Sequence, residues 1–470
     1  MTVLSVGMAV AKKPENRPNI VWMMLEDWST DLSCHGTKGI HTPVCDTLAA
    51  EGIRYENAFC TAPVCSPSRS AMMTGFHQNY IGAHQHRTKN RKKKPLPHGI
   101  KPLPVLLKEA GYHTCLMNNT KTDCNFKVDL GFEGKDWSGR ADGQPFFAQI
   151  TFDGTHRKWK RDTKRPIDPD DVEIPPYYAD TPFVRRDWAN GLEQMQICDR
   201  EVGEILRRLD DEGLADNTLV FLIGDNGRCH FRGKQFLYDP GLHVPLIVRW
   251  PGEVKPGQVR DELVQTIDIT ATILKVAGIE PPHPLHGKDL FGEEIKQREY
   301  VFAARDKMDD THDAMRMVRS KKYKLIHNLM PERPWLQFNA YKESRYPALA
   351  EMSVFHLQGK LDPVQDAFFA KSKPEFELYD LEKDPHETQN LADDPKLAET
   401  KAKLLAELNR WRKSIDDQGV SEQFRKGGWP AGYPTRTLEE WQALREKWKP
   451  WVFRAPDSNM KCPVRAPWEK

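Results

Sequence analysis

The segment from residue 65 to residue 75 combines a cysteine, an arginine and the features of a helix start. Ser66 suits the helix N-cap, Pro67 suits the first helical position, and the closing glycine suits the end of the helix. Cys65 would then lie just before a helix N-terminus, whose free N–H groups and positive dipole favour anions. Arg69 follows one helical turn later and should lie near Cys65. A nucleophile beside an arginine at a helix N-terminus indicates a site for a sulfate or phosphate group.

Two apolar runs, at 19–25 and 218–223, each lead to a pair of side chains that offer oxygen ligands. Such runs predict strands that are buried on both faces, as in a parallel sheet. In open α/β sheets, ligands bind beyond the carboxyl ends of the strands. Three carboxylates and one amide oxygen are hard ligands that suit Ca²⁺, with Mg²⁺ as the alternative, better than zinc. The predicted metal ligands are Glu26, Asp27, Asp225 and Asn226.

The segment 65–69 resembles the C-x-P-S-R signature of the sulfatase family, which belongs to the alkaline-phosphatase-like superfamily. In that family the cysteine is converted to formylglycine, an aldehyde that hydrates to a gem-diol. One hydroxyl attacks sulfur, and the other then loses its proton and expels sulfate, which restores the aldehyde. The resemblance therefore implies a formylglycine derived from Cys65 and, as a partner, a formylglycine-generating enzyme.

The resemblance covers most of the chain, from about residue 17 to about residue 398. Residues 26–36 resemble the family's opening acidic pair and the turn after it, 41–49 the next helix, and 224–227 the second acidic motif. Residues 376–391 are similar to the family's C-terminal subdomain, including that of its heparan N-sulfatase branch. An isolated acid at a strand end would more simply be a turn or N-cap residue, but two pairs that both match the family favour a metal site.

The same resemblance implies roles for further side chains. Basic side chains would hold the sulfate, and His156, which follows the predicted strand at 145–152, would protonate the leaving oxygen. A histidine in a loop can also be ordinary polar surface, and a lysine can be a solvated charge. The predicted catalytic residues are Cys65, Arg69, Lys121, His156 and Lys234, and the predicted substrate-binding residues are His230 and Arg232.

Two positions depart from the family pattern. Glu26 stands where the family usually has Asp, and its longer side chain can still bind a metal but shifts the backbone. Most of the family carries a strand that ends in G-K-W-H, whereas this chain has Asn119 at the lysine position and Lys121 at the histidine position. Lys121 would supply the missing positive charge from a new backbone position. The change indicates a polysaccharide-desulfating branch rather than a generic arylsulfatase.

The order of elements predicts an α/β fold with an alkaline-phosphatase-like core, in which helices flank a mixed, mostly parallel sheet. Strands are expected at 19–25, 145–152, 218–223 and 244–250, and helices at 103–110, from residue 192 to about 213, and at 267–277. Short strands at 315–327 and 376–381 and one amphipathic helix at 397–415 predict a smaller C-terminal α/β subdomain with an antiparallel sheet. The predicted domains are a catalytic domain at 17–310, the C-terminal subdomain at 311–425, and a tail at 426–470 that packs on the core.

The composition argues against several classes of protein. The 470 residues carry 69 Lys+Arg and 67 Asp+Glu, a formal charge of +2, which does not favour nucleic-acid binding. The nine cysteines are odd in number and form no C-x-x-C pair, so neither a small disulfide framework nor a zinc ribbon is expected. No stretch approaches the roughly 20 apolar residues of a transmembrane segment. A basic cluster at 87–94 is either a solvated loop or a surface that binds an anionic substrate.

Residues 2–11 form a short apolar run that ends in an A-x-A pattern and is followed by two lysines and a proline. This pattern predicts the remnant of a secretory signal peptide over residues 1–16, with a disordered tail as the alternative. The expected location of the protein is accordingly the periplasm or outside the cell.

These features predict an enzyme that hydrolyses a sulfate ester on a sugar of a sulfated polysaccharide or oligosaccharide. A phosphonate monoester or phosphodiester hydrolase is one alternative, because it would share the fold, the metal site and sometimes the modified cysteine. A non-catalytic protein that binds sulfated glycans is the other, in which Cys65 would stay a thiol, because a fold does not by itself determine function.

Overall fold

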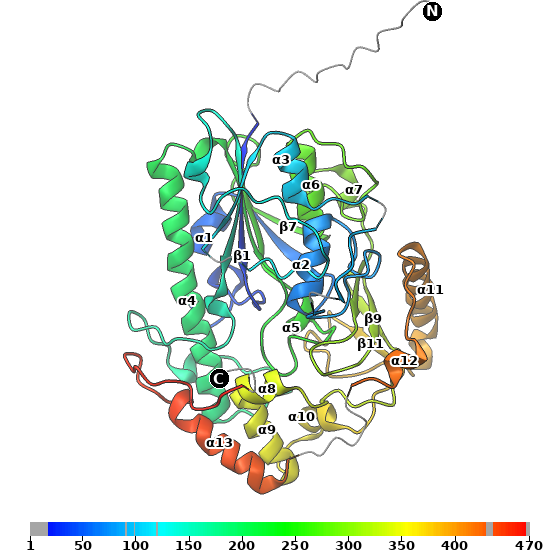
Figure 1. Ribbon diagram of the computed structural model, residues 1–470. Coiled ribbons are helices and arrows are strands. Elements are labelled where there is room, and N and C mark those ends of the chain that lie inside the picture. Colours follow the sequence, from blue (N-terminus) through cyan, green and yellow to red (C-terminus); the bar gives the residue numbers. More distant parts are fainter. Residues whose placement is uncertain (1–16, 90–91, 98, 119–120, 429–435, 467–470) are drawn as a thin grey trace, which may run out of the picture.

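The computed structural model describes residues 17–89, 92–97, 99–118, 121–428 and 436–466 (Figure 1). A seven-stranded sheet, in the order β3-β4-β1-β5-β6-β2-β7, forms its centre. The strands are β1 (Asn19–Leu25), β2 (Ile53–Phe59), β3 (His113–Met117), β4 (Phe146–Phe152), β5 (Thr218–Gly224), β6 (Leu246–Arg249) and β7 (Gln258–Gln265). Only β6 runs antiparallel to its neighbours, β5 and β2, so the other strands end at the same edge of the sheet. The expected mixed, mostly parallel sheet is confirmed.

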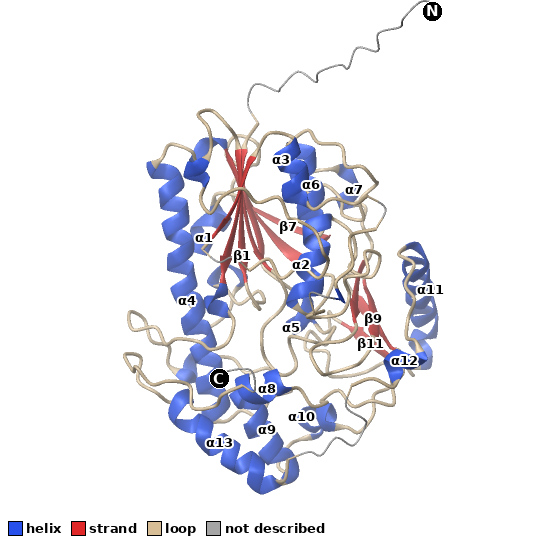
Figure 2. Cartoon of the chain, viewed as in Figure 1, coloured by secondary structure: helices blue, strands red, loops and turns tan. Residues whose placement is uncertain are grey.

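Strand β1 alternates its side chains between two apolar layers. Val21 and Met23 pack in the layer that contains α1 (Pro43–Ala50) and the long helix α4 (Pro182–Asp211). Trp22 and Met24 pack in the opposite layer. That layer contains α2 (Cys65–Thr74), α3 (Leu103–Glu109) and α6 (Asp268–Val276), and Figure 2 shows helices on both faces of the sheet. Because both faces are covered, every residue of β1 is buried.

A second, antiparallel sheet has the order β11-β10-β9-β8. Its strands are β8 (Val301–Arg305), β9 (Met315–Arg319), β10 (Tyr323–Asn328) and β11 (Phe376–Asp380). One face packs on α11 (Ala398–Ser414) through Leu404, Leu408 and Trp411. Strand β8 comes before residue 311, so this sheet includes a strand from the segment that the sequence suggested for the catalytic domain. The proposed domain boundaries remain predictions.

The remaining helices are short or lie in the C-terminal part of the chain. They are α5 (Asp239–Leu242), α7 (Glu293–Lys296), α8 (Ala340–Arg345), α9 (Pro347–Leu357), α10 (Pro363–Asp366), α12 (Glu422–Arg425) and α13 (Leu438–Val452). Trp448 and Val452 of α13 are buried in the same core as α4 and α9. None of the helices in the described ranges combines the length and apolar character of a bilayer-crossing segment. The predicted signal-peptide remnant, residues 1–16, lies outside the described residues.

Two helix starts differ from the sequence prediction. Helix α4 begins at Pro182 rather than near Leu192, because its first turns are buried on nearly all sides and so lack an amphipathic period. Helix α2 begins at Cys65, with Val64 as its N-cap, so the assignment of Ser66 as N-cap is wrong. The Ser66 hydroxyl instead accepts a hydrogen bond from the backbone N–H of Arg87 over 3.2 Å.

Strands β2, β3, β7 and β8 were not among the strands expected from apolar runs in the sequence. β2 and β7 lie at one side of the sheet, where several of their residues are only partly buried, and neither forms a continuous apolar run. The expected strand at 244–250 is β6, and its antiparallel direction is set by tertiary pairing, which a short apolar run does not reveal.

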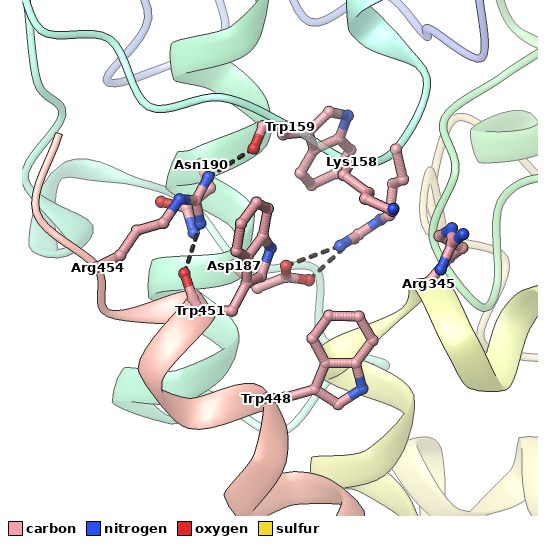
Figure 3. Close-up of a pocket in the computed structure, with 9 residues that line it drawn as sticks. Lys158, Trp159, Asp187, Asn190, Arg345, Trp448, Trp451 and Arg454 are labelled. Atoms are coloured by element: carbon pink, nitrogen blue, oxygen red, sulfur yellow. Dashed lines mark hydrogen bonds and ion pairs between the residues drawn. The ribbon is translucent and has the colours of Figure 1, made fainter. Parts of the chain in front are cut away.

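A buried ion pair fixes the segment that follows β4. The Arg157 guanidinium donates two hydrogen bonds to the Asp187 carboxylate of α4, over 2.8 and 2.9 Å, and its centre lies 3.8 Å from the Trp159 ring. The pair lines a cavity of about 10 Å³ between α4 and α13 (Figure 3). Because His156 directly precedes Arg157, this ion pair also limits where that histidine can lie.

We expect Asp187→Asn to destabilise the protein by about 3–5 kcal/mol, because it leaves a buried arginine without its carboxylate. Asp180→Asn is the matched control: Asp180 also pairs with an arginine, Arg185, through two hydrogen bonds, but its side chain is 52% exposed. That change should cost no more than about 1 kcal/mol. Urea unfolding midpoints of the two variants and the unaltered protein give the comparison. Equal effects of the two substitutions would contradict this account of the pair.

Candidate active site

The ends of β1 and β5 bring the four proposed metal ligands together. Because the two strands are parallel neighbours in register, the residues that follow them leave the sheet side by side. The Asp27 N–H donates to Asp225 Oδ1 over 2.9 Å, and Asn226 Nδ2 donates to Asp27 Oδ1 over 3.0 Å. Asp27 has a φ of 52°, which turns the chain sharply after β1. Glu26 is 2% exposed and the other three side chains are fully buried.

Arg69 and Lys121 neutralise one side of this acidic cluster. Arg69, one turn into α2, donates from Nε to Asp225 Oδ2 over 2.7 Å and from Nη2 to Glu26 Oε1 over 2.9 Å. Lys121 Nζ lies 2.8 Å from the same Glu26 oxygen. The lysine that stands at the family's histidine position therefore places its charge beside Glu26. Asn119, at the family's lysine position, lies outside the described residues.

Lys234 neutralises the other side of the cluster. Its Nζ donates to both Asp27 carboxylate oxygens, over 2.6 and 2.7 Å, and lies 3.8 Å from Cys65 Sγ. The lysine is 1% exposed, so the ion pair forms without direct hydration. Lys234 thus contacts both the acidic cluster and the cysteine.

Burial is the largest influence on the three carboxyl groups, and acting alone it would raise their pKa. The nearby positive charges outweigh it for Glu26 and Asp27, whose pKa lies below the ordinary value. The pKa of Asp225 stays raised, because repulsion from the other two carboxylates adds to burial.

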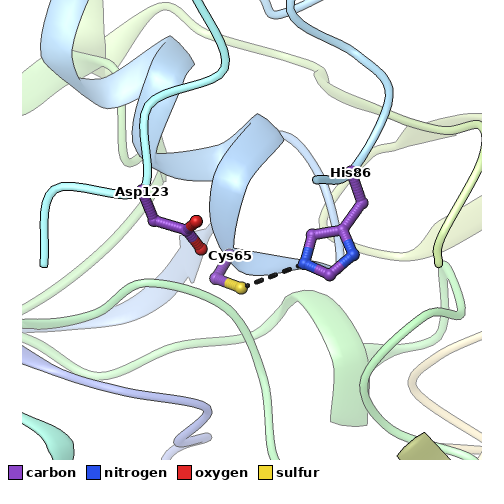
Figure 4. A group of neighbouring side chains, drawn as sticks. All are labelled: Cys65, His86 and Asp123. Atoms are coloured by element: carbon purple, nitrogen blue, oxygen red, sulfur yellow. Dashed lines mark hydrogen bonds between the residues drawn. The ribbon is translucent and has the colours of Figure 1, made fainter. Parts of the chain in front are cut away.

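Cys65 occupies the first position of α2 and is 1% exposed. Its Sγ lies 3.4 Å from His86 Nε2, and the sulfur, a ring nitrogen of His86 and a carboxylate oxygen of Asp123 all lie within 4.8 Å of one another (Figure 4). Burial raises the pKa of the Cys65 thiol to about 12, against the attraction of nearby Lys234. The unmodified side chain is therefore a protonated thiol at neutral pH, which is a weak nucleophile.

His156 follows β4 and a short 3₁₀ turn, and its side chain is 20% exposed. Its Nε2 lies 3.0 Å from the Tyr341 hydroxyl and 3.5 Å from Asp27 Oδ2, and its Nδ1 lies 2.8 Å from the Arg157 carbonyl oxygen. Burial lowers the pKa of His156, and the Asp27 carboxylate only partly opposes this. A side chain that reaches both the cluster and solvent is well placed for proton transfer.

The structure does not bring His230 and Arg232 into this cluster. His230 is 4% exposed and packs against aromatic rings, with the Trp188 ring centre 4.5 Å away. Arg232 is 6% exposed, stacks over Tyr177 at 4.2 Å, and donates to the backbone carbonyl of Glu387. Their substrate-binding role stays a prediction, and the contacts seen here are packing contacts.

Four residues at the site were missed from the sequence: His86, Asp123, Asp309 and Tyr341. His86 is buried beside Cys65, and its Nδ1 lies 3.3 Å from Asp309 Oδ1. No motif marks these residues, since each lies in a loop or a short helix without periodicity. His86 directly precedes the basic cluster that starts at Arg87, so its sequence context is that of a charged loop rather than of a residue in contact with Cys65.

A larger cavity, of about 870 Å³, lies beside the loops that carry the cluster. Tyr177, Trp188, Arg228 and Arg319 are among the residues that line it, and none of the predicted site residues does. The chemistry centred on Cys65 therefore lies outside this cavity.

Comparison with known proteins gives consistent matches. The Sulfatase family model matches residues 18–133 and 128–279, more than half of the chain. The family model described as N-sulphoglucosamine sulphohydrolase, C-terminal, matches residues 227–345. An ulvan-active sulfatase from Formosa agariphila is 33% identical over 458 residues, which cover 86% of this chain and 76% of that protein. The human N-sulphoglucosamine sulphohydrolase is 27% identical over 469 residues, covering 86% of this chain and 91% of that protein.

The fold also matches a solved structure of BT4656 in complex with its substrate D-glucosamine-2-N,6-O-disulfate. The TM-score is 0.64 with 18% sequence identity, and the match covers 87% of this chain and all of the other. At this identity the likeness concerns the fold, which agrees with the α/β core described above. The family models, the identity to the Formosa sulfatase and the fold together show that this chain belongs to the sulfatase family, the sulfuric ester hydrolases.

Proposed function

We propose that the chain hydrolyses a sulfate ester of a sugar through a formylglycine made from Cys65, with a divalent cation held at the ends of β1 and β5. One observation carries the proposal: a buried thiol with a raised pKa stands at a helix N-terminus, beside a buried cluster of three carboxylates. A protonated thiol in that position is a poor nucleophile, whereas a hydrated aldehyde offers hydroxyl groups there.

The acidic cluster fits a hard cation. Asn226 Oδ1 is buried without a hydrogen-bond partner, which is the state expected of a ligand atom that faces an ion. With the carboxylates of Glu26, Asp27 and Asp225 it forms an all-oxygen donor set that suits Ca²⁺ or Mg²⁺. A cation held by these residues would neutralise sulfate charge and favour ionisation of a bound hydroxyl. We keep Glu26 as a proposed ligand because its carboxylate is buried in the cluster beside those of Asp27 and Asp225, with Arg69 in contact with both Glu26 and Asp225.

The basic side chains around residue 65 support binding of the sulfate group. Arg69, Lys121 and Lys234 each contact a cluster carboxylate, so their positions are fixed before a substrate arrives. Fixed positive charges stabilise a sulfuryl transition state without reorganisation. We assign His156 as the acid that protonates the leaving oxygen, since it is the histidine that combines contact with Asp27 and partial exposure.

The identity of the substrate is inferred from relatives. One similar protein is named an ulvan-active sulfatase and another an N-sulphoglucosamine sulphohydrolase, both of which act on sulfated sugars by name. We therefore propose a sulfated polysaccharide or oligosaccharide as substrate. The expected maturation partner is a formylglycine-generating enzyme, and the A-x-A pattern near the N-terminus supports a periplasmic or secreted location.

Two other functions remain to be separated from this one by experiment. A phosphonate monoester or phosphodiester hydrolase would also use a cation and a formylglycine, and rates on sulfate and phosphate esters with one shared leaving group distinguish it. A non-catalytic glycan-binding protein would need no modification of Cys65. The position of residue 65 beside the paired carboxylates and basic side chains favours an enzyme over a binding protein, because a protein that only binds glycans does not require a nucleophile there.

Co-expression with a formylglycine-generating enzyme should convert Cys65 to formylglycine, lowering the mass of its tryptic peptide by about 18 mass units. The converted protein should hydrolyse sulfated sugars, whereas Cys65→Ala should have no turnover. Peptide mass spectrometry and sulfate release measure the two properties in the same preparation. Cys198→Ala, at a buried cysteine of α4, is the control that should keep both the conversion and the turnover. An unmodified thiol in the presence of an active maturing enzyme would favour the glycan-binding alternative.

Removal of divalent cations should abolish turnover and lower the thermal unfolding midpoint. Ca²⁺ added at about 100 times its Kd should stabilise the folded state by about 2.7 kcal/mol, because it binds only the assembled cluster. The Asn226→Leu variant should lose most of this stabilisation. Scanning calorimetry with Ca²⁺, with Mg²⁺ and with chelator alone measures the effect independently of activity. An unfolding midpoint that does not respond to either ion would argue against the assigned metal site.

His156→Gln should lower turnover by about 10²–10⁴-fold on a sugar sulfate, whose alkoxide leaves poorly without a proton. The loss should be much smaller on 4-nitrophenyl sulfate, because nitrophenolate leaves without protonation. His41→Gln, at an exposed histidine outside the site, serves as the control for both substrates. Steady-state rates on the two substrates provide the test. A loss of the same size on both would mean that His156 has a role other than protonating the leaving group.

A further inference from the structure

Release of sulfate from residue 65 requires a proton acceptor beside that residue. If the proposed formylglycine mechanism holds, a hydroxyl remains on the residue after the sulfate group has been transferred, and it must lose its proton before sulfate can leave. Cys65 Sγ marks the place of the reacting oxygens. The basic groups nearest to it are therefore the candidates for this proton transfer.

The lysines of the site are poor candidates. The Nζ groups of Lys121 and Lys234 contact carboxylates at 2.8 Å or less. Each ammonium group is thereby engaged in an ion pair, Lys121 with Glu26 and Lys234 with Asp27. An ammonium group has three N–H donors and no lone pair, so it can stabilise charge but cannot accept another proton.

His86 is the imidazole in contact with residue 65. Its Nε2 lies 3.4 Å from Cys65 Sγ, and its Nδ1 lies 3.3 Å from Asp309 Oδ1 on the opposite side of the ring. The histidine is 1% exposed, so water does not compete for either nitrogen. Its backbone N–H donates to the Lys307 carbonyl over 3.0 Å, which ties its loop to the segment that carries Asp309. Figure 4 shows the imidazole directed at Cys65.

The charges around the ring suit a base that becomes protonated during the reaction. Burial lowers the pKa of His86, so the imidazole starts neutral, and the Asp309 carboxylate opposes this shift. Burial would raise the pKa of Asp309 itself, yet His86 and Arg87 hold it well below its usual range, so the carboxylate stays charged. Arg87 Nη1 lies 3.7 Å from the same Asp309 oxygen, and Asp123 faces the site from the other side of Cys65.

We propose that His86 is the proton acceptor for sulfate release from residue 65 and that Asp309 is the positioning residue that orients it. In this step the hydroxyl O–H bond breaks and an Nε2–H bond forms. The electron pair left on oxygen becomes the second bond of the aldehyde carbonyl, and the C–O bond to sulfate breaks with its pair leaving on sulfate. The inference rests on the proposed formylglycine at residue 65, and it assigns to His86 a role that no sequence motif assigned.

The test is His86→Gln in protein matured with a formylglycine-generating enzyme, with 4-nitrophenyl sulfate as the probe. Gln keeps a polar side chain of similar length but cannot take up the proton. The variant should release about one equivalent of nitrophenol in a burst, and steady turnover should then fall by about 10²–10⁴-fold. The peptide that contains residue 65 should carry one SO₃ group more than the hydrated formylglycine peptide in the mass spectrum. This covalent readout does not depend on turnover.

Asp309→Asn is the second variant, and it should accumulate the same sulfated peptide with a smaller loss of turnover, because the imidazole is still present. His84→Gln, two positions away and partly exposed, should accumulate none. Circular dichroism and the formylglycine content of each variant establish that the proteins compared are folded and matured.

Three results would overturn the proposal. His86→Gln could lose turnover without accumulating sulfated peptide, which would limit the histidine to a packing role. Sulfated peptide in Asp123→Asn but not in His86→Gln would give the role to the carboxylate instead. Unaltered, formylglycine-containing protein that neither releases nitrophenol nor becomes sulfated would overturn the proposed function, and this inference with it.

Discussion

The site depends on three carboxylates that leave two adjacent strand ends and are buried together. Buried carboxylates repel one another and lose hydration, so each needs a positive partner at close range. Arg69 comes from α2, Lys121 from the loop after β3, and Lys234 from the loop after β5, and each lies within 2.9 Å of a carboxylate oxygen. Segments far apart in the chain are thereby held at one edge of the sheet, and the helix that begins at Cys65 is held with them.

The same burial explains the state of the cysteine. A thiol excluded from water ionises with difficulty, and the positive charges of Lys234 and Lys121 do not reverse this. The basic side chains proposed to bind sulfate therefore surround a Cys65 thiol that is uncharged and thus a weak nucleophile. The proposed conversion to an aldehyde would resolve the conflict, because the hydrated form would supply a nucleophile whose ionisation a cation at the cluster would favour. Burial, charge and the proposed modification would then be parts of one arrangement.

Lys121, which stands where the family has a histidine, has a specific partner in the structure. Sequence resemblance placed a lysine where the family has a histidine, and the structure shows that lysine paired with Glu26. The two residues that depart from the family pattern, Glu26 and Lys121, thus meet in one ion pair. An imidazole, that of His86, reaches residue 65 from the loop after α2. The surroundings of the cysteine therefore contain both a cation, Lys234, and an imidazole.

The sequence by itself determined the family, the α/β class, the strands β1, β4 and β5, and the residues at the ends of β1 and β5. These features are local: apolar runs, a helix start and short motifs are complete within a few consecutive residues. Tertiary structure alone decided the pairing and direction of β6, the start of α4, the packing of His230 and Arg232 away from the cluster, and the contact of His86 with Cys65 and Asp309. Those outcomes depend on which distant segments share a desolvated space, and because burial and charge pairing act across the fold, no local pattern encodes them.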